Sequence, residues 1–99
     1  MAGEKLLERK LKHEIEKLGG ECLKFYSHYR VGMPDRFLIM PNGLFYMAEI
    51  KGCKGKTSGI QNSTIEKLRS LGHKVFVINS DGSLKDLINE IRAGIDGGI

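Results

Sequence analysis

The chain of 99 residues carries 16 Lys and Arg residues against 12 Asp and Glu, a formal net charge of +4. This length predicts one domain over residues 1–99, with a core large enough to fold without disulfides or a structural metal. No apolar run approaches the roughly 20 residues of a membrane span, and no signal-peptide pattern occurs, so no membrane partner is expected. The moderately basic balance is compatible with a nucleic-acid partner but does not demand one.

The two cysteines, Cys22 and Cys53, stand far apart and form no C-x-x-C pair. Neither a zinc site nor a redox motif is therefore indicated. Two free thiols and the lack of a signal-peptide pattern predict a reducing, cytoplasmic location.

The first part of the chain predicts a helix followed by a strand. Apolar residues recur at helical spacing over residues 4–18, and Gly19-Gly20 end that pattern. Residues 21–27 have the composition of a strand. A loop over residues 28–33 follows and mixes aromatic, basic and flexible residues.

Two short apolar and aromatic runs, residues 36–40 and 44–51, predict the strands of one hairpin. The three-residue loop Pro41-Asn42-Gly43 joins them. Such a loop favours a type I turn followed by a left-handed residue, which suits these residues in that order.

The register of this hairpin brings charged side chains together on one face. The loop pairs Met40 with Leu44, and counting back along the ladder places Asp35 opposite Glu49. Lys51 shares the face of Glu49 because side chains alternate along a strand. Two opposed carboxylates repel, and a divalent cation or a shared proton would offset the repulsion. Oxygen ligands suit Mg²⁺ or Mn²⁺ rather than zinc. The alternative is a solvated polar face with three unrelated charges.

A second helix is predicted over residues 58–72, beginning with a capping box formed by Ser58 and Gln61. The apolar run at residues 74–79 predicts a buried strand parallel to the second strand of the hairpin.

The C-terminal part predicts a last helix capped by Ser83 and then a flexible tail over residues 94–99. Ile95 and Ile99 would leave apolar surface there for pairing with a second subunit. The element order predicts an α/β domain with a small mixed sheet flanked by helices.

The strings Gly32-Met33-Pro34-Asp35-Arg36 and Ala48-Glu49-Ile50-Lys51, followed by Gln61, resemble the virus-type replication-repair nuclease (VRR-NUC) branch of the PD-(D/E)xK nuclease superfamily. The resemblance runs from about residue 4 to residue 79. It implies a restriction-endonuclease-like core in the order α-β-β-β-α-β-α and hydrolysis of phosphodiester bonds with Mg²⁺ or Mn²⁺. In this family the domain often stands alone as a small phage or bacterial protein, which for a phage protein implies the host cytoplasm.

The resemblance implies roles for residues of the hairpin. Asp35, Glu49 and the backbone carbonyl of Ile50 would hold the metal ion. Lys51 would position the attacking water or neutralise charge developing on the phosphate.

It also implies roles for residues on the first and second helices. The family has a leading Glu on its first helix, a role that Glu8 takes here, with Glu4 as the alternative. Glu8 would ligate a metal directly or reach it through water. A Gln at the place of Gln61 points toward the catalytic Lys in this family, so Gln61 has a catalytic and a capping interpretation.

Five residues are expected to contact nucleic acid. Tyr29 could stack on an unpaired base, and Arg30 could hold a phosphate. Arg36, beside the catalytic Asp, and Lys54 and Lys56, in a basic glycine-containing loop, are the other candidates. The alternative for these loops is ordinary solvated surface.

The resemblance therefore implies a metal-dependent, structure-selective DNA endonuclease acting on branched DNA, and, because stand-alone members of the family resemble Holliday-junction resolvases, specifically a homodimeric resolvase of four-way junctions. A dyad supplies the two symmetric cuts that a junction needs. The alternatives are a nuclease that nicks flaps or forks, a non-catalytic nucleic-acid-binding module, and a small structural protein.

Overall fold

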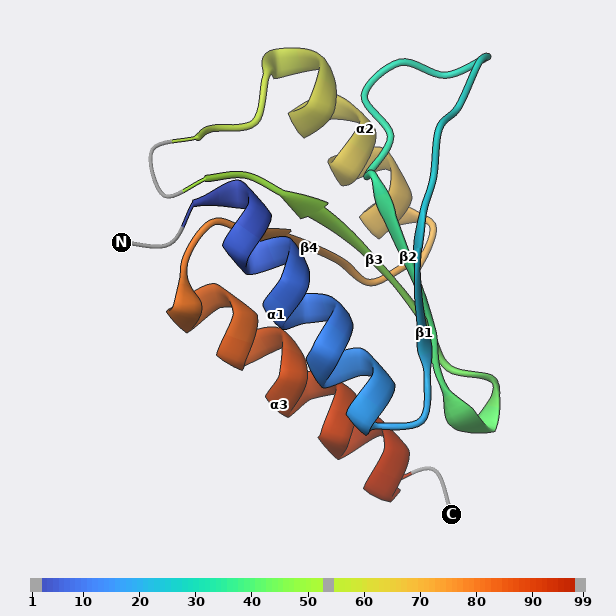
Figure 1. Cartoon of the computed structure of the whole chain (residues 1–99). Helices are drawn as coiled ribbons and strands as arrows, with labels where there is room; N and C mark the ends of the chain where they lie inside the picture. The colour runs from blue at the N-terminus through green and yellow to red at the C-terminus, as the bar shows by residue number, and fades with distance from the viewer. Residues whose placement is uncertain (1–2, 53–54, 98–99) are drawn as a thin grey trace.

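The computed structural model describes residues 3–52 and 55–97 (Figure 1). Its elements are α1 (Glu4–Lys17), β1 (Glu21–Lys24), β2 (Arg36–Ile39), a 3₁₀ turn (Pro41–Gly43), β3 (Phe45–Ile50), α2 (Gly59–Ser70), β4 (Val75–Ile78) and α3 (Asp81–Gly97). This order and the mixed sheet confirm the predicted α/β class. No helix of the described ranges is long and apolar enough to cross a membrane.

The four-stranded sheet has the order β1-β2-β3-β4. β2 is antiparallel to β1 and β3, whereas β4 lies parallel to β3, as predicted. Arg36 pairs with Ala48. One step beyond this pair, Asp35 and Glu49 stand opposite each other, so the predicted hairpin register is correct.

The hairpin loop differs from the prediction at one residue. The Met40 N–H donates to the Leu44 carbonyl oxygen at 2.9 Å, which closes the loop where expected. Asn42, however, has a φ of 64° and Gly43 a φ of 74°, so both lie in the left-handed region. The expected type I turn needs a right-handed second residue. Asn adopts the left-handed region more readily than most residues do.

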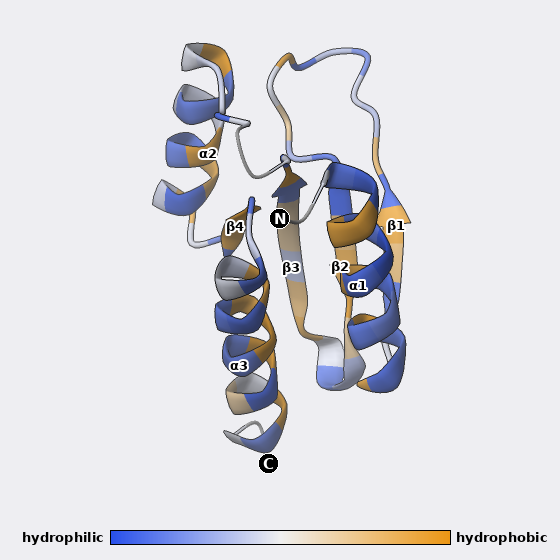
Figure 2. Cartoon of the chain, turned by 60° about the vertical axis from the view of Figure 1, so that its left-hand side comes forward, coloured by the Kyte–Doolittle hydropathy of each residue, from blue (hydrophilic) through white to orange (hydrophobic). Residues whose placement is uncertain are grey.

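The sheet separates two layers of helix, with α1 and α3 on one face and α2 on the other (Figure 1). Figure 2 shows the apolar stripes of α1 and α3 turned toward the strands. The larger core between them contains Leu7, Leu11, Ile15, Leu38, Tyr46, Ala48, Ile50, Ile78, Leu87 and Ile91. A smaller cluster of Met47, Ile65 and Val75 lies under α2. Because Ala48 and Ile50 face the larger core, Glu49 must face the α2 side.

The start of α3 corrects the prediction that Ser83 caps it. The helix begins at Asp81, two residues earlier. The Ser83 N–H donates to Ser80 Oγ at 3.1 Å, and the Ser80 N–H donates back to Ser83 Oγ at 3.1 Å. Ser80 is therefore the cap, and Ser83 is its reciprocal partner in the first turn.

The end of α3 corrects the prediction of a tail over residues 94–99, because the helix continues to Gly97. Gly94 does not end it. A Cβ on this glycine would come 2.6 Å from Tyr46 Oη, so the missing side chain allows close packing of the helix against the sheet. Ile95 packs against the larger core and is not a free apolar end. Ile99 lies outside the described residues.

Candidate active site

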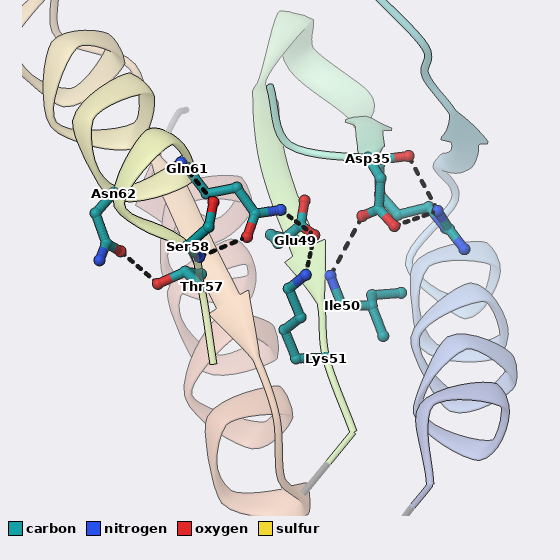
Figure 3. Close-up of polar contacts among 9 residues, drawn as sticks. Asp35, Glu49, Ile50, Lys51, Thr57, Ser58, Gln61 and Asn62 are labelled. Carbon is teal, nitrogen blue, oxygen red and sulfur yellow. Dashed lines mark hydrogen bonds and ion pairs between the residues drawn. The ribbon is translucent and has the colours of Figure 1, made fainter. Parts of the chain in front are cut away.

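Asp35 and Glu49 come together at the end of the two central strands, where β2 begins and β3 ends (Figure 3). Asp35 Oδ1 accepts a hydrogen bond from the Ile50 N–H at 3.2 Å, which fixes this carboxylate across the strand from Glu49. Glu49 is buried, with 5% of its surface exposed. Strand geometry directs the N–H and carbonyl of one residue to the same side, so the Ile50 carbonyl also points toward β2.

A buried arginine connects Asp35 to α1. One guanidinium nitrogen of Arg36 forms an ion pair with Asp35 Oδ2 at 2.9 Å and donates a hydrogen bond to the Asp35 main-chain carbonyl oxygen at 3.0 Å, and another forms an ion pair with Glu8 Oε2 at 3.0 Å. Its side chain is only 6% exposed. The predicted nucleic-acid contact of Arg36 would require this side chain to leave the two carboxylates that it pairs with beneath the surface. Glu8 lies on the α1 side of the sheet and approaches Asp35 through Arg36.

Lys51 and Gln61 hold the Glu49 carboxylate from the α2 side (Figure 3). Lys51 Nζ lies 3.3 Å from Glu49 Oε2, and Gln61 Nε2 donates to the same oxygen at 2.9 Å. The other end of the Gln61 amide accepts from the Ser58 N–H at 3.0 Å, while Ser58 Oγ accepts from the Gln61 N–H at 3.1 Å. The predicted capping box is confirmed, and the same side-chain amide also contacts Glu49; the catalytic interpretation of Gln61 stays a prediction.

The repulsion between the two carboxylates affects the pKa of Glu49. Its pKa is raised, first by burial and second by the negative charge of Asp35, while Lys51 and Gln61 act in the opposite direction. A carboxylate whose charge is opposed by a like-charged neighbour gains from a cation placed between the two.

The donor set fits a hard divalent cation. Asp35 and Glu49 offer carboxylate oxygens, and Mg²⁺ is commonly bound through one or two carboxylates together with water and substrate phosphate. Over residues 3–52 and 55–97, no three His, Cys, Asp or Glu side chains gather as a metal-binding group. The carboxylate oxygens of the pair are of the kind that Mg²⁺ and Mn²⁺ accept. Glu4 and Glu8 do not complete a cluster of three with the pair.

A cleft of about 350 Å³ opens over the carboxylates, lined by Asp35, Glu49 and Gln61 and by residues 25–27 and 30–33 of the loop before β2. Tyr29 and Arg30 are exposed on this loop, where a nucleic-acid strand could reach them. Lys56 is also exposed. Lys54 and Cys53 lie outside the described residues.

Sequence reasoning missed what holds this loop in place. Thr64, on α2 and 3% exposed, donates to the Val31 carbonyl oxygen at 3.0 Å. Ser27 Oγ accepts from the Arg30 N–H at 2.9 Å. A threonine on the inner face of an amphipathic helix was the available signal, since a buried hydroxyl requires a partner.

Known proteins are similar to this chain over most of its length. The VRR-NUC domain family matches residues 1–82. The chain is 38% identical over 74 residues to "Putative nuclease p44" of Acyrthosiphon pisum secondary endosymbiont phage 1, covering 75% of this chain and 80% of that protein. It also resembles a solved "VRR_NUC domain" structure, with a TM-score of 0.81 and 30% identity over 90% of this chain and 97% of that one.

Proposed function

The chain belongs to the VRR-NUC family of nucleases, and from this premise we propose that it is a divalent-metal-dependent endonuclease that cuts branched DNA. The observation that carries the proposal is the opposed pair Asp35 and Glu49, with Lys51 beside it, at the base of a cleft. Arg30 lines this cleft from an exposed loop, and the formal net charge of +4 favours a polyanionic partner.

Four side chains around the cleft have separate roles in the proposed reaction. Asp35 and Glu49 would hold Mg²⁺ or Mn²⁺, with the Ile50 carbonyl as a further oxygen donor. When bound, the cation supplies a Lewis acid for the phosphate and lowers the pKa of coordinated water. Lys51 holds the attacking water or offsets the charge that develops on the phosphate oxygens. Gln61 fixes the orientation of the Glu49 carboxylate through its 2.9 Å hydrogen bond.

Glu8 is a positioning residue in this proposal. Its carboxylate holds the Arg36 guanidinium, which in turn holds Asp35 Oδ2. The resemblance implies instead that Glu8 ligates a metal or reaches it through water; in the structure Arg36 engages one of its two carboxylate oxygens.

Cleavage assays on defined DNA structures test the proposal. Purified protein should cut labelled four-way junction, flap or fork DNA with Mg²⁺ or Mn²⁺ and lose the activity in EDTA. Asp35→Asn should abolish cleavage while the fold is retained. Asp86→Asn, which neutralises an exposed carboxylate on α3, is the matched control and should cut normally. Cleavage that survives in Asp35→Asn would refute the site. DNA binding unaffected by EDTA, with no cutting under any ion, would favour a binding module.

The finer proposal is a homodimer that resolves four-way junctions. The described residues hold one candidate site, and resolution requires two symmetric cuts, so two copies related by a dyad fit this substrate. Sedimentation at micromolar concentration together with mapping of the cuts tests it. A monomer, or one unpaired nick per junction, would favour the flap- or fork-nicking alternative.

A further inference from the structure

A second cavity of about 460 Å³ adjoins the catalytic cleft. It lies between the loop that joins β1 to β2 and the first turns of α2, which run close together in Figure 1. We call it the loop–helix groove; Tyr29, Arg30 and Val31 form one wall, and Ile60, Ser63 and Thr64 form the other. Arg30 and Val31 line both the groove and the catalytic cleft, so the two spaces adjoin at these residues.

Specific contacts fix the shape of the groove. Thr64 holds the Val31 carbonyl from α2 at 3.0 Å, and Ser27 Oγ holds the Arg30 N–H at 2.9 Å. Gly32 has a φ of 85°, and a Cβ there would come 2.9 Å from the Ile60 carbonyl oxygen. The loop is therefore docked on α2 by a buried hydroxyl and by a close approach that only glycine allows.

The walls of the groove expose apolar side chains that the fold does not use. Tyr29 is 101% exposed, Val31 73% and Ile60 58%. Grouped exposed apolar side chains mark binding surfaces more often than isolated ones do. Arg30 adds a positive charge on the side of the catalytic cleft, and the Ser63 hydroxyl adds a hydrogen-bonding group.

We propose that the loop–helix groove binds an unpaired nucleobase of the DNA strand whose neighbouring phosphate lies over Asp35 and Glu49. The Tyr29 ring would stack on the base, and Val31 and Ile60 would contact it. Arg30, which lines both spaces, would hold the phosphate that joins this nucleotide to the strand in the cleft. A base in intact duplex can enter only after it is unstacked, which costs a few kcal/mol. The groove therefore gives the nuclease its preference for sites that already contain an unpaired base. This inference rests on the proposed function and names the feature of the substrate that the site selects.

Binding without cleavage tests the groove separately from catalysis. Fluorescence of 2-aminopurine, placed unpaired at a branch point or paired within a duplex of the same sequence, is titrated with protein in EDTA. Tyr29→Ala should weaken binding of the unpaired probe roughly 5- to 150-fold, the range expected for loss of one base–aromatic stack. It should change binding of the paired duplex less than about twofold. Tyr29→Phe keeps the ring and should bind normally.

Leu71→Ala is the matched control, since it truncates a 61% exposed apolar side chain at the far end of α2 and should leave both affinities unchanged. Equal weakening on unpaired and paired probes would overturn the inference, because it would indicate a general backbone contact. Unchanged affinity in Tyr29→Ala would also overturn it. If Tyr29→Ala instead dissociates a dimer in sedimentation, the groove is a contact between copies and the inference fails. Failure of the proposed function would appear separately, as absent cleavage by the unaltered protein with Mg²⁺ or Mn²⁺.

Discussion

Arg36→Met tests the buried bridge between α1 and the candidate active site. The substitution removes the guanidinium that contacts Asp35 Oδ2 at 2.9 Å and Glu8 Oε2 at 3.0 Å. Removal of one partner from a fully buried ion pair costs about 3–5 kcal/mol, whereas exposed pairs contribute about 0–1 kcal/mol. The Arg36 side chain is 6% exposed, but the Glu8 and Asp35 side chains are 37% and 31% exposed, so water can solvate both carboxylates. Glu8 also keeps Lys24 at 4.0 Å, and Asp35 keeps the hydrogen bond from the Ile50 N–H.

The expected loss lies between these limits, at about 2 kcal/mol in the free energy of unfolding. For a domain of this size that corresponds to a fall in Tm of roughly 10 °C. Urea and thermal unfolding followed by circular dichroism measure it. Lys10→Met is the matched control on the same helix, because it breaks an ion pair with Asp81 whose side chains are 43% and 66% exposed. This control should lose less than about 1 kcal/mol. An Arg36→Met loss no larger than that of the control would refute the bridge.

The ion pairs from Glu8 through Arg36 to Asp35 also predict how substitution of Glu8 affects cleavage. If Glu8 acts through Arg36, Glu8→Gln should slow cleavage less than Asp35→Asn and leave Mn²⁺ affinity within about threefold, measured by calorimetry. Gln at this position can still accept from the guanidinium, although without the charge. Loss of Mn²⁺ binding in Glu8→Gln would instead support direct ligation by Glu8.

Three further predictions concern the carboxylate pair. Burial and the Asp35 charge raise the Glu49 pKa above its ordinary value of 4.5, so the folded state holds this proton more tightly than the unfolded state does. The unfolding free energy of the metal-free protein minus that of Glu49→Gln should therefore fall as pH rises above 4.5, by at most about 1.4 kcal/mol per pH unit. Urea titrations across pH measure it, and a rise of this quantity with pH would refute the assigned cause. Lys51→Ala should lose cleavage rate while Mn²⁺ affinity in calorimetry stays equal or increases, because a cation is removed from beside the carboxylates. Gln61→Glu keeps an acceptor for the Ser58 N–H but sets a carboxylate against Glu49. The metal-free variant should therefore lose about 1 kcal/mol in the free energy of unfolding at pH 7 and recover it with Mn²⁺. Ser58→Ala weakens only the cap and should lose a similar amount that Mn²⁺ does not restore.

The hairpin register was predictable because it depends on a local feature. A three-residue loop fixes which residues face one another, and side-chain alternation then assigns each residue to a face of the sheet. These rules place Asp35, Glu49 and Lys51 correctly. The left-handed conformation of Asn42 was not predictable in the same way, since asparagine is compatible with either hand at that position.

The partners of Arg36 and Gln61 depend on how distant elements pack, which no local pattern encodes. Arg36 follows Asp35 in sequence and was expected to contact nucleic acid, but α1 supplies Glu8 as its partner and the side chain is buried. For Gln61 the sequence supplied both interpretations. It could not show that they are compatible, because that depends on the start of α2 lying over the end of β3.

The sequence suggested that a bound cation or a shared proton offsets the repulsion between Asp35 and Glu49. The structure shows a third way to reduce this repulsion. Arg36 pairs with Asp35 from the α1 side, while Lys51 and Gln61 contact Glu49 from the α2 side. Each carboxylate therefore has its own partner, and the fold can form before any ion binds. The partners do not cancel the repulsion, since the Glu49 pKa remains raised. A cation placed between the two carboxylates would remove the remaining cost, so the free energy of unfolding should increase with the ion concentration as RT ln(1 + [ion]/Kd).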